Sequence, residues 1–141
     1  MNIRLANESD APAIADLCGQ MGYPAKPEEV SRRLGQITQS EQYALFIAEV
    51  DGQVAGWIHV VTYPLLDMDL HAELGGLVVN EAQRGQGIGR ALMLRAEQWA
   101  RRGGCREMRI RSNMTRTGSH EFYKKAGFEI IKSQYTFRKI L

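Results

Sequence analysis

Residues 84–89 read Arg84-Gly85-Gln86-Gly87-Ile88-Gly89, and this glycine-rich turn decides the fold. It follows an apolar, strand-like run at residues 77–79 and precedes a helical pattern that starts at Ile88. Glycine permits backbone angles and close approaches that a Cβ would block. The first N–H groups of a helix have no partner within it, and together with the helix dipole they form an anion site. Arg84 and Arg90 add positive charge, so the turn predicts a site for a pyrophosphate.

Two other phosphate-binding turns fit this spacing less well. A mononucleotide P-loop needs a lysine followed by serine or threonine, and no such pair follows the glycines. A dinucleotide-binding turn needs GxGxxG and an acidic residue about 20 positions later. Here Gly85-x-Gly87-x-Gly89 is one residue short, although Glu107 lies near the expected acidic position, and too little chain follows for the second half of that fold. The remaining alternative is a turn whose glycines only serve packing.

The rest of the sequence predicts an α/β fold with a mixed sheet and helices on its faces. Asp51-Gly52 between two apolar runs is a strong hairpin signal, and Gly75-Gly76 inside a strand indicates a bulge or a ligand close to the backbone. Nothing divides the chain, so residues 1–141 are expected to form a single domain. We expect the order βααβββαβαββ, with strands at residues 3–6, 43–50, 53–62, 72–79, 107–112, 128–131 and 135–140, and helices at residues 10–22, 26–37, 88–101 and 116–126.

Composition narrows the class of protein. A chain of 141 residues with 44% hydrophobic and 24% charged residues is average for a soluble globular protein. The net charge of +2 does not favour a nucleic-acid partner, and no apolar run reaches the roughly 20 residues that cross a bilayer. Cys18 and Cys105 lack the spacing of a zinc site or a disulfide framework, so neither a metal nor a disulfide is expected. A cytoplasmic enzyme or binding protein is the natural class.

Two motifs together resemble the GNAT superfamily of acyl-CoA N-acyltransferases. Arg84-x-x-Gly87-x-Gly89 resembles the family's acyl-CoA pyrophosphate motif, and the strand at residues 74–79 is similar to its central strand. Arg116-x-x-Ser119-x-x-Phe122-Tyr123-x-x-Ala126-Gly127-Phe128 resembles its second motif, in which alanine is commoner than Ser119. The motifs occur in the family's order, and the expected elements match its fold along essentially the whole chain. Either motif alone is weak, whereas the pair is quite specific.

The resemblance implies that acetyl-CoA is the acyl donor. Its pantetheine arm would pair with the central strand, and an N–H near Leu77 would polarise the thioester carbonyl. Asn113 is either a donor toward the cofactor or a turn residue, and packing is the stronger role for Phe122. The implied acyl-CoA-binding residues are Leu77, Val78, Val79, Arg84, Gly85, Gln86, Gly87, Ile88, Gly89, Arg90, Asn113, Ser119 and Phe122.

The resemblance also implies the catalytic groups. Tyr123 is the candidate acid, because a phenol with a pKa near 10 keeps its proton at neutral pH and can give it to the leaving thiolate. Glu73 is the candidate base, acting directly or through water, since family members often use a glutamate on this strand. His71 and His59 are alternative bases, because a neutral imidazole accepts a proton readily.

The identity of the amine acceptor is left open by the sequence. Asp67, Asp69 and Glu73 gather negative charge before and within the central strand, which favours a cationic acceptor such as an aminoglycoside, a polyamine or a lysine-like amine. The acceptor is therefore expected to be a primary amine of a small cationic or peptide molecule. No cysteine lies in either motif, so direct attack in a ternary complex is expected rather than an acyl-enzyme. The alternative is a non-catalytic acyl-CoA sensor on the same fold. Family members often dimerise, sometimes through their last strands, so a homodimer is expected.

Overall fold

The computed structural model describes residues 1–112 and 114–141, which form two compact units, Met1–Arg111 and Ser112–Leu141. The first unit contains a five-stranded sheet of order β1-β2-β3-β4-β5. Neighbouring strands are antiparallel except for β4 and β5, which are parallel. The predicted mixed sheet is therefore confirmed. Its strands are β1 (Asn2–Leu5), β2 (Tyr43–Val50), β3 (Gln53–Leu65), β4 (Met68–Val79) and β5 (Met108–Ile110).

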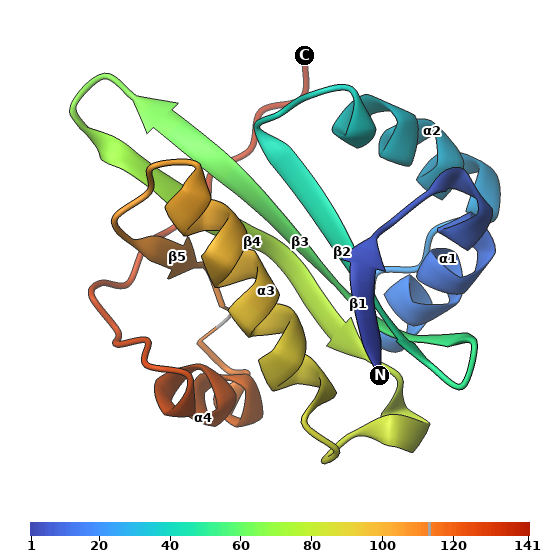
Figure 1. Ribbon diagram of the computed structural model, residues 1–141. Helices are drawn as coiled ribbons and strands as arrows, with labels where there is room; N and C mark the ends of the chain where they lie inside the picture. The colour runs from blue at the N-terminus through green and yellow to red at the C-terminus, as the bar shows by residue number, and fades with distance from the viewer. Residues whose placement is uncertain (113) are drawn as a thin grey trace. The chain divides into compact units, whose positions relative to one another are not determined.

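Helices cover both faces of this sheet. Between β1 and β2 the chain forms η1 (Glu8–Asp10), α1 (Ala11–Gln20) and α2 (Pro27–Thr38). Between β4 and β5 it forms η2 (Glu81–Gln83) and α3 (Ile88–Arg102), and Figure 1 shows α3 crossing the front of the sheet. A crossover between parallel strands places its helix on one face of the sheet. The α1 and α2 helices pack on the opposite face, which we call the α1/α2 face.

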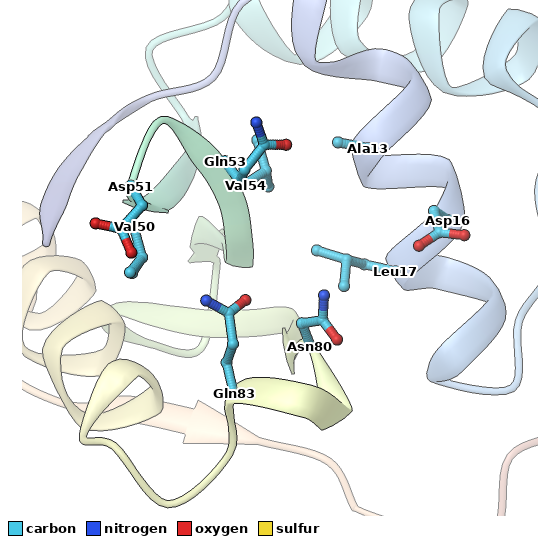
Figure 2. A pocket seen from close by; sticks show the side chains of 9 residues that line it. All are labelled: Ala13, Asp16, Leu17, Val50, Asp51, Gln53, Val54, Asn80 and Gln83. Carbon is cyan, nitrogen blue, oxygen red and sulfur yellow. The ribbon is translucent and has the colours of Figure 1, made fainter.

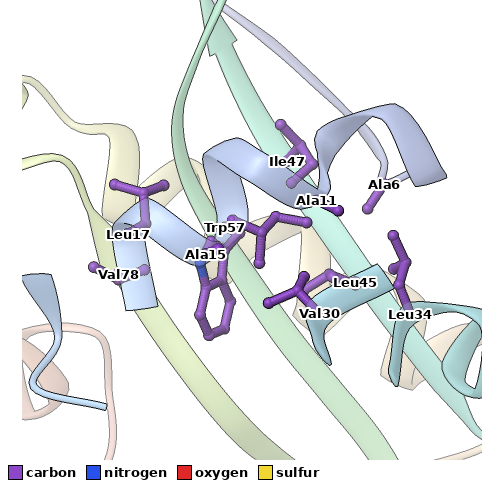
Figure 3. Close-up of a cluster of buried hydrophobic side chains, with 11 residues drawn as sticks. Ala6, Ala11, Ala15, Leu17, Val30, Leu34, Leu45, Ile47, Trp57 and Val78 are labelled. Atoms are coloured by element: carbon purple, nitrogen blue, oxygen red, sulfur yellow. The ribbon is translucent and has the colours of Figure 1, made fainter. Parts of the chain in front are cut away.

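The α1/α2 face carries one of the two buried layers. In Figure 3, Leu17 of α1 and Val30 and Leu34 of α2 lie over strand side chains that include Ile47 and Trp57. On the α3 side, side chains such as Ile58, Val60 and Leu92 are completely buried. Each fully buried aliphatic side chain contributes about 1.5–3 kcal/mol, so the two layers hold the sheet rigidly beneath any site on its surface.

The two hairpins of the sheet differ in how well the sequence predicted them. Asp51 and Gly52 both have positive φ, 51° and 75°, as a tight two-residue turn requires, so the predicted β2–β3 hairpin is confirmed. The strand predicted at residues 53–62 ends too early, because β3 continues through Tyr63 and Pro64 to Leu65 and β4 already begins at Met68. The pairing is irregular between Tyr63 and Leu65, and such an irregularity accommodates a proline that has no N–H to donate.

The second unit contains α4 (Thr117–Lys125), which ends at Gly127 with a φ of 97°. The strands predicted at residues 128–131 and 135–140 are wrong, since residues 128–141 form neither helix nor strand. Residues 132–134 contain no glycine, asparagine or proline to fix a tight turn. An isolated two-stranded hairpin is also only marginally stable in water. The strand predicted at 107–112 is present but shorter, as β5.

Candidate active site

The glycine-rich turn joins β4 to α3 through η2. Gly85 and Gly87 have φ values of 79° and 82°, and Gly87 is the N-cap residue of α3. A Cβ built on either glycine meets no atom within 4 Å, so the space above the turn is open. The Arg84 Nε donates a hydrogen bond to the Val79 carbonyl at 3.2 Å, which ties the turn to the end of β4.

The turn has the properties that a diphosphate requires. The N–H groups at the start of α3, from Ile88 to Arg90, have no carbonyl partner within the helix. The positive end of the helix dipole lies at the same place. Gly85 and Gly87 are exposed and keep bulk away from these donors. The residues therefore fit a pyrophosphate, as the sequence predicted, and Arg84 and Arg90 stay predicted contacts.

A hollow of about 450 Å³ lies just before this turn. Figure 2 shows the amides of Asn80 and Gln83 on one side of it and Asp16 on α1 on the other. The predicted catalytic residues are not among its lining. Its residues are Ala13, Asp16, Leu17, Val50, Asp51, Gln53, Val54, Asn80 and Gln83.

The central strand has a free edge beyond its middle. β5 pairs with β4 only through Ala72, Glu73 and Leu74. From residue 75 to 79, β3 is the only strand among the described residues that pairs with β4. The backbone groups of Leu77 and Val79 lie in this stretch. An extended ligand can add to such an edge as another strand would, and the course of the pantetheine arm along it stays a prediction.

The predicted irregularity at Gly75-Gly76 is confirmed as a β-bulge. His59 of β3 pairs with Gly76, whereas the next residue, Val60, pairs with Leu74, so Gly75 is the extra residue. A Cβ on Gly75 would lie 2.7 Å from the His59 Nδ1, and one on Gly76 would lie 2.9 Å from the Trp57 ring. Glycine is required at both positions because two rings lie against the backbone of the bulge.

Glu73 is held beside two basic side chains. Its Oε1 lies 3.4 Å from an Arg111 guanidinium nitrogen and 3.6 Å from the His71 Nε2, and its side chain is 16% exposed. His71 is buried, and its ring lies 5.7 Å from that of Tyr63. The structure thus brings together the predicted base and one of its alternatives. The Arg111 contact had no signal in the sequence.

Strand pairing places the candidate acceptor-side groups on one face. Tyr43 of β2 pairs with Val61, which pairs with Glu73, and residues paired across neighbouring strands project to the same side of a sheet. His59 is two residues from Val61, so the two side chains lie on the same face of the sheet. Trp57 is two residues before His59 and packs against α1 and α2, so this face is the α1/α2 face. Sequence reasoning missed Tyr43, which begins an ordinary apolar strand.

The predicted cluster of negative charge is not compact. Asp67 lies at the turn of the β3–β4 hairpin, and Asp69 is exposed near the start of β4. Asp69 and Glu73 are four strand residues apart, roughly 13 Å at the usual rise of a strand. Of the three acidic residues, Glu73 is therefore the one that lies near the bulge.

In the second unit, Tyr123 lies near the end of α4. Burial raises the pKa of its phenol, partly opposed by the Arg116 charge. Its ring makes edge contacts with Phe122 at 5.5 Å and Phe128 at 5.9 Å, so Phe122 takes part in local packing. Ser119 is half-buried on the same helix. Asn113 lies outside the described residues.

The described residues contain neither a candidate membrane span nor a group of metal ligands. No described helix combines the length and the apolar character needed to cross a membrane. Across residues 1–112 and 114–141, no three His, Cys, Asp or Glu side chains are grouped as a metal ion would require.

Comparison with known proteins identifies the relatives of this chain. The model of the acetyltransferase (GNAT) family matches residues 11–128. Aminoglycoside N(6')-acetyltransferase type 1 of Stenotrophomonas maltophilia is 28% identical over 141 residues, covering 96% of this chain and 91% of that protein. Aminoalkylphosphonate N-acetyltransferase of Salmonella typhimurium strain LT2 is 33% identical over 92 residues, covering 64% of this chain and 58% of that protein.

Solved structures share the fold. The apo aminoglycoside 6'-N-acetyltransferase AAC(6')-IG of Acinetobacter haemolyticus superposes with a TM-score of 0.88 at 20% identity, covering 100% of this chain and 99% of that one. AAC(6')-Iy, in complex with the bisubstrate analogue CoA-S-monomethyl-acetylneamine, gives 0.87 at 24% identity, covering 99% and 98%. These likenesses confirm the predicted fold class.

Proposed function

The chain belongs to the acetyltransferase (GNAT) family and is an acetyl-CoA-dependent N-acyltransferase, and we propose that it acetylates the primary amine of a small cationic acceptor by direct attack. The observation that carries the proposal is the Glu73 carboxylate, which lies on the α1/α2 face where the free edge of β4 begins. An amine held by this carboxylate would meet a thioester laid along that edge. The relatives named for aminoglycosides and an aminoalkylphosphonate support a small amine as acceptor.

The donor would be held by the backbone of the first unit. The turn from Arg84 to Gly89 would bind the pyrophosphate through N–H groups, and Leu77 and Val79 would pair with the pantetheine arm. An N–H near Leu77 would stabilise the negative charge that develops on the thioester oxygen. Such a preorganised donor is worth about 10²–10³-fold in rate.

Glu73 and Tyr123 would carry the two opposite proton transfers. Glu73 accepts a proton from the acceptor ammonium, and the free amine attacks the carbonyl carbon. The carbon–sulfur bond breaks, and the leaving thiolate takes the phenolic proton of Tyr123. Burial raises the pKa of Tyr123, so the phenol keeps its proton until a thiolate forms. The role of Tyr123 is supported by its place in the second motif.

A screen of primary amines for thiol release from acetyl-CoA tests this function. We expect turnover with a cationic amine and binding of acetyl-CoA by calorimetry. Glu73→Gln should lower kcat/KM for the amine by about 10²–10⁴-fold, as general-base loss does. The matched control is Glu107→Gln, because Glu107 also contacts an arginine, Arg109, but its side chain is 53% exposed. Binding of acetyl-CoA without turnover of any amine would favour the alternative, a non-catalytic acyl-CoA sensor. Failure to bind any CoA species would contradict both the acetyltransferase and the sensor.

Tyr123→Phe tests the acid separately. It should lower kcat by about 10²–10⁴-fold while leaving the affinity for acetyl-CoA unchanged. A rate within twofold of the wild type would remove Tyr123 from the mechanism and leave the amine proposal intact.

We also propose that residues 1–141 form one acetyltransferase domain, and that the protein is a homodimer in the cytoplasm. The C-terminal segment, residues 128–141, supports a dimer, because its large apolar side chains are exposed to solvent. Phe137, for example, is 91% exposed, and soluble monomers rarely expose many such groups together. Sedimentation should therefore give twice the monomer mass, and Phe137→Asp should halve it. A wild type that sediments as a monomer at micromolar concentration would contradict the dimer.

A further inference from the structure

The imidazole of His59 is fixed in position but lacks a polar partner. Its ring stacks on Tyr43, with centroids 6.0 Å apart and an interplanar angle of 25°. Its Nδ1 lies over Gly75 at the bulge. Its Nε2 is buried and has no hydrogen-bond partner among the described residues. Gly75 is exposed, so the Nδ1 above it, and not the buried Nε2, is the ring nitrogen that a bound acceptor reaches.

The proton balance of the proposed reaction requires a second proton acceptor. An alkylammonium that becomes an amide loses two protons from its nitrogen. One must leave before attack, to free the lone pair, and the other leaves after the carbon–nitrogen bond has formed. Glu73 accounts for the first. Tyr123 gives a proton to sulfur and so cannot take the second.

We propose that His59 is a further catalytic residue, which accepts the second proton of the acceptor nitrogen through its Nδ1 over the bulge at Gly75. This inference rests on the proposed function, because it needs an amine on the α1/α2 face. The nitrogen attacks the thioester carbon, its remaining extra proton moves to His59, and the electrons of the carbon–sulfur bond leave with sulfur, which takes the Tyr123 proton. Solvent then removes the protons from Glu73 and the imidazolium and returns one to the Tyr123 phenolate, so that one proton is released in each turnover.

The surroundings of His59 suit this task. Burial lowers the pKa of the imidazole, so the ring is neutral and does not repel a cationic amine before reaction. The titratable groups on the packed elements are Tyr43 on β2, Glu73 and His71 on β4, and Cys18 on α1. Of these, Glu73 already holds the first proton once the amine has been freed, so the second proton needs a separate acceptor. Glu73 and His59 therefore accept the two protons of the nitrogen in turn.

Three variants separate proton transfer from packing. His59→Phe keeps a ring over Gly75 and against Tyr43 but cannot accept a proton. His59→Asn keeps a hydrogen-bonding oxygen near the position of Nδ1, but the oxygen is not basic. Both should lower kcat by about 10²-fold or more with saturating substrates, without changing the acetyl-CoA affinity, and the asparagine variant should keep the amine KM. His59→Ala removes the ring and leaves room for an added base.

Chemical rescue decides between the roles. Added imidazoles of different basicity should restore turnover to His59→Ala, with a rate that rises with the pKa of the added base. If the added molecule only filled the cavity left by the ring, the rate would depend on the size of that molecule instead. Thermal melts of all three variants check folding. The inference is overturned if His59→Phe retains kcat within twofold, or if rescue tracks size alone. In either case, wild-type turnover and loss of activity in Glu73→Gln would leave the proposed function standing.

Discussion

Replacing Gly76 by alanine should destabilise the first unit by forcing a methyl group against Trp57. The new Cβ would lie 2.9 Å from both Cη2 and Cζ3 of the indole, whereas carbon atoms in contact prefer about 3.5–4.0 Å. The ring or the strand must therefore move by at least ~0.6 Å. The indole is only 6% exposed and packs in the α1/α2 core, so neither moves freely. Overpacking of this kind costs about 1–3 kcal/mol. Gly76 has no positive φ, so the cost comes from the contact alone.

Urea denaturation measures this loss directly, and a second substitution identifies its cause. Trp57→Phe withdraws the distal ring atoms that the methyl group would meet, so the double variant should be more stable than the two single losses predict, by about 1 kcal/mol or more. Gly35→Ala is the matched control, since a Cβ there meets nothing within 4 Å in an exposed part of α2. It should stabilise by up to ~1 kcal/mol. A Gly76→Ala protein within 0.5 kcal/mol of the wild type, or strictly additive losses, would refute the packing account of the bulge.

Two further predictions concern the Arg4–Asp10 pair and the glycine turn. Asp10→Asn should lower the free energy of unfolding by about 1–3 kcal/mol, because the buried carboxylate takes two 2.8 Å hydrogen bonds from Arg4. Arg4 holds the pKa of Asp10 below its usual range, so this stability is present above the unfolded pKa near 3.9 and is lost as pH falls through the lower folded value. Urea melts across that range should show that the stability of Asp10→Asn depends less on pH than that of the wild type. An unchanged pH dependence would contradict a stabilising Arg4–Asp10 pair. Gly87→Ala should weaken acetyl-CoA binding about tenfold by calorimetry, because alanine is strained at a φ of 82° and its methyl group enters the open space above the turn. Gly104→Ala is the matched control, because Gly104 has a similar φ of 89° but lies outside the turn. It should bind acetyl-CoA normally.

Features that depend on a few neighbouring residues were predictable from sequence. The Asp51-Gly52 hairpin needs only two residues that tolerate positive φ. The start of α2 at Pro27 is equally local, because proline fits the first turn of a helix and the Glu29 carboxylate accepts a 3.0 Å hydrogen bond from the Lys26 N–H. The turn before α3 belongs to the same class, so its position between a strand and a helix was predictable, whereas its contacts with a donor stay a prediction.

Features that depend on a distant partner were not predictable in the same way. Residues 128–131 and 135–140 have the apolar, β-branched and aromatic composition of strands, and strand propensity mostly reflects fit to a pleated, half-buried surface. Without a strand to pair with, that composition specifies no structure. The Arg111 contact with Glu73 is similar, because it joins residues 38 positions apart across two parallel strands. No local pattern marks such a pair.

The bulge at Gly75 explains why the acceptor side required the structure. In a regular strand, Glu73 and Gly76 are an odd number of residues apart and would project to opposite faces. A single extra residue reverses that parity, as a one-residue shift of register does. The pairing of Gly76 with His59 and of Glu73 with Val61 shows that both lie on the α1/α2 face. Strict alternation would have placed Glu73 beneath α3, away from Tyr43 and His59. The two glycines therefore do more than make room for the His59 and Trp57 rings: they turn the carboxylate of the central strand toward the face that carries the His59 imidazole.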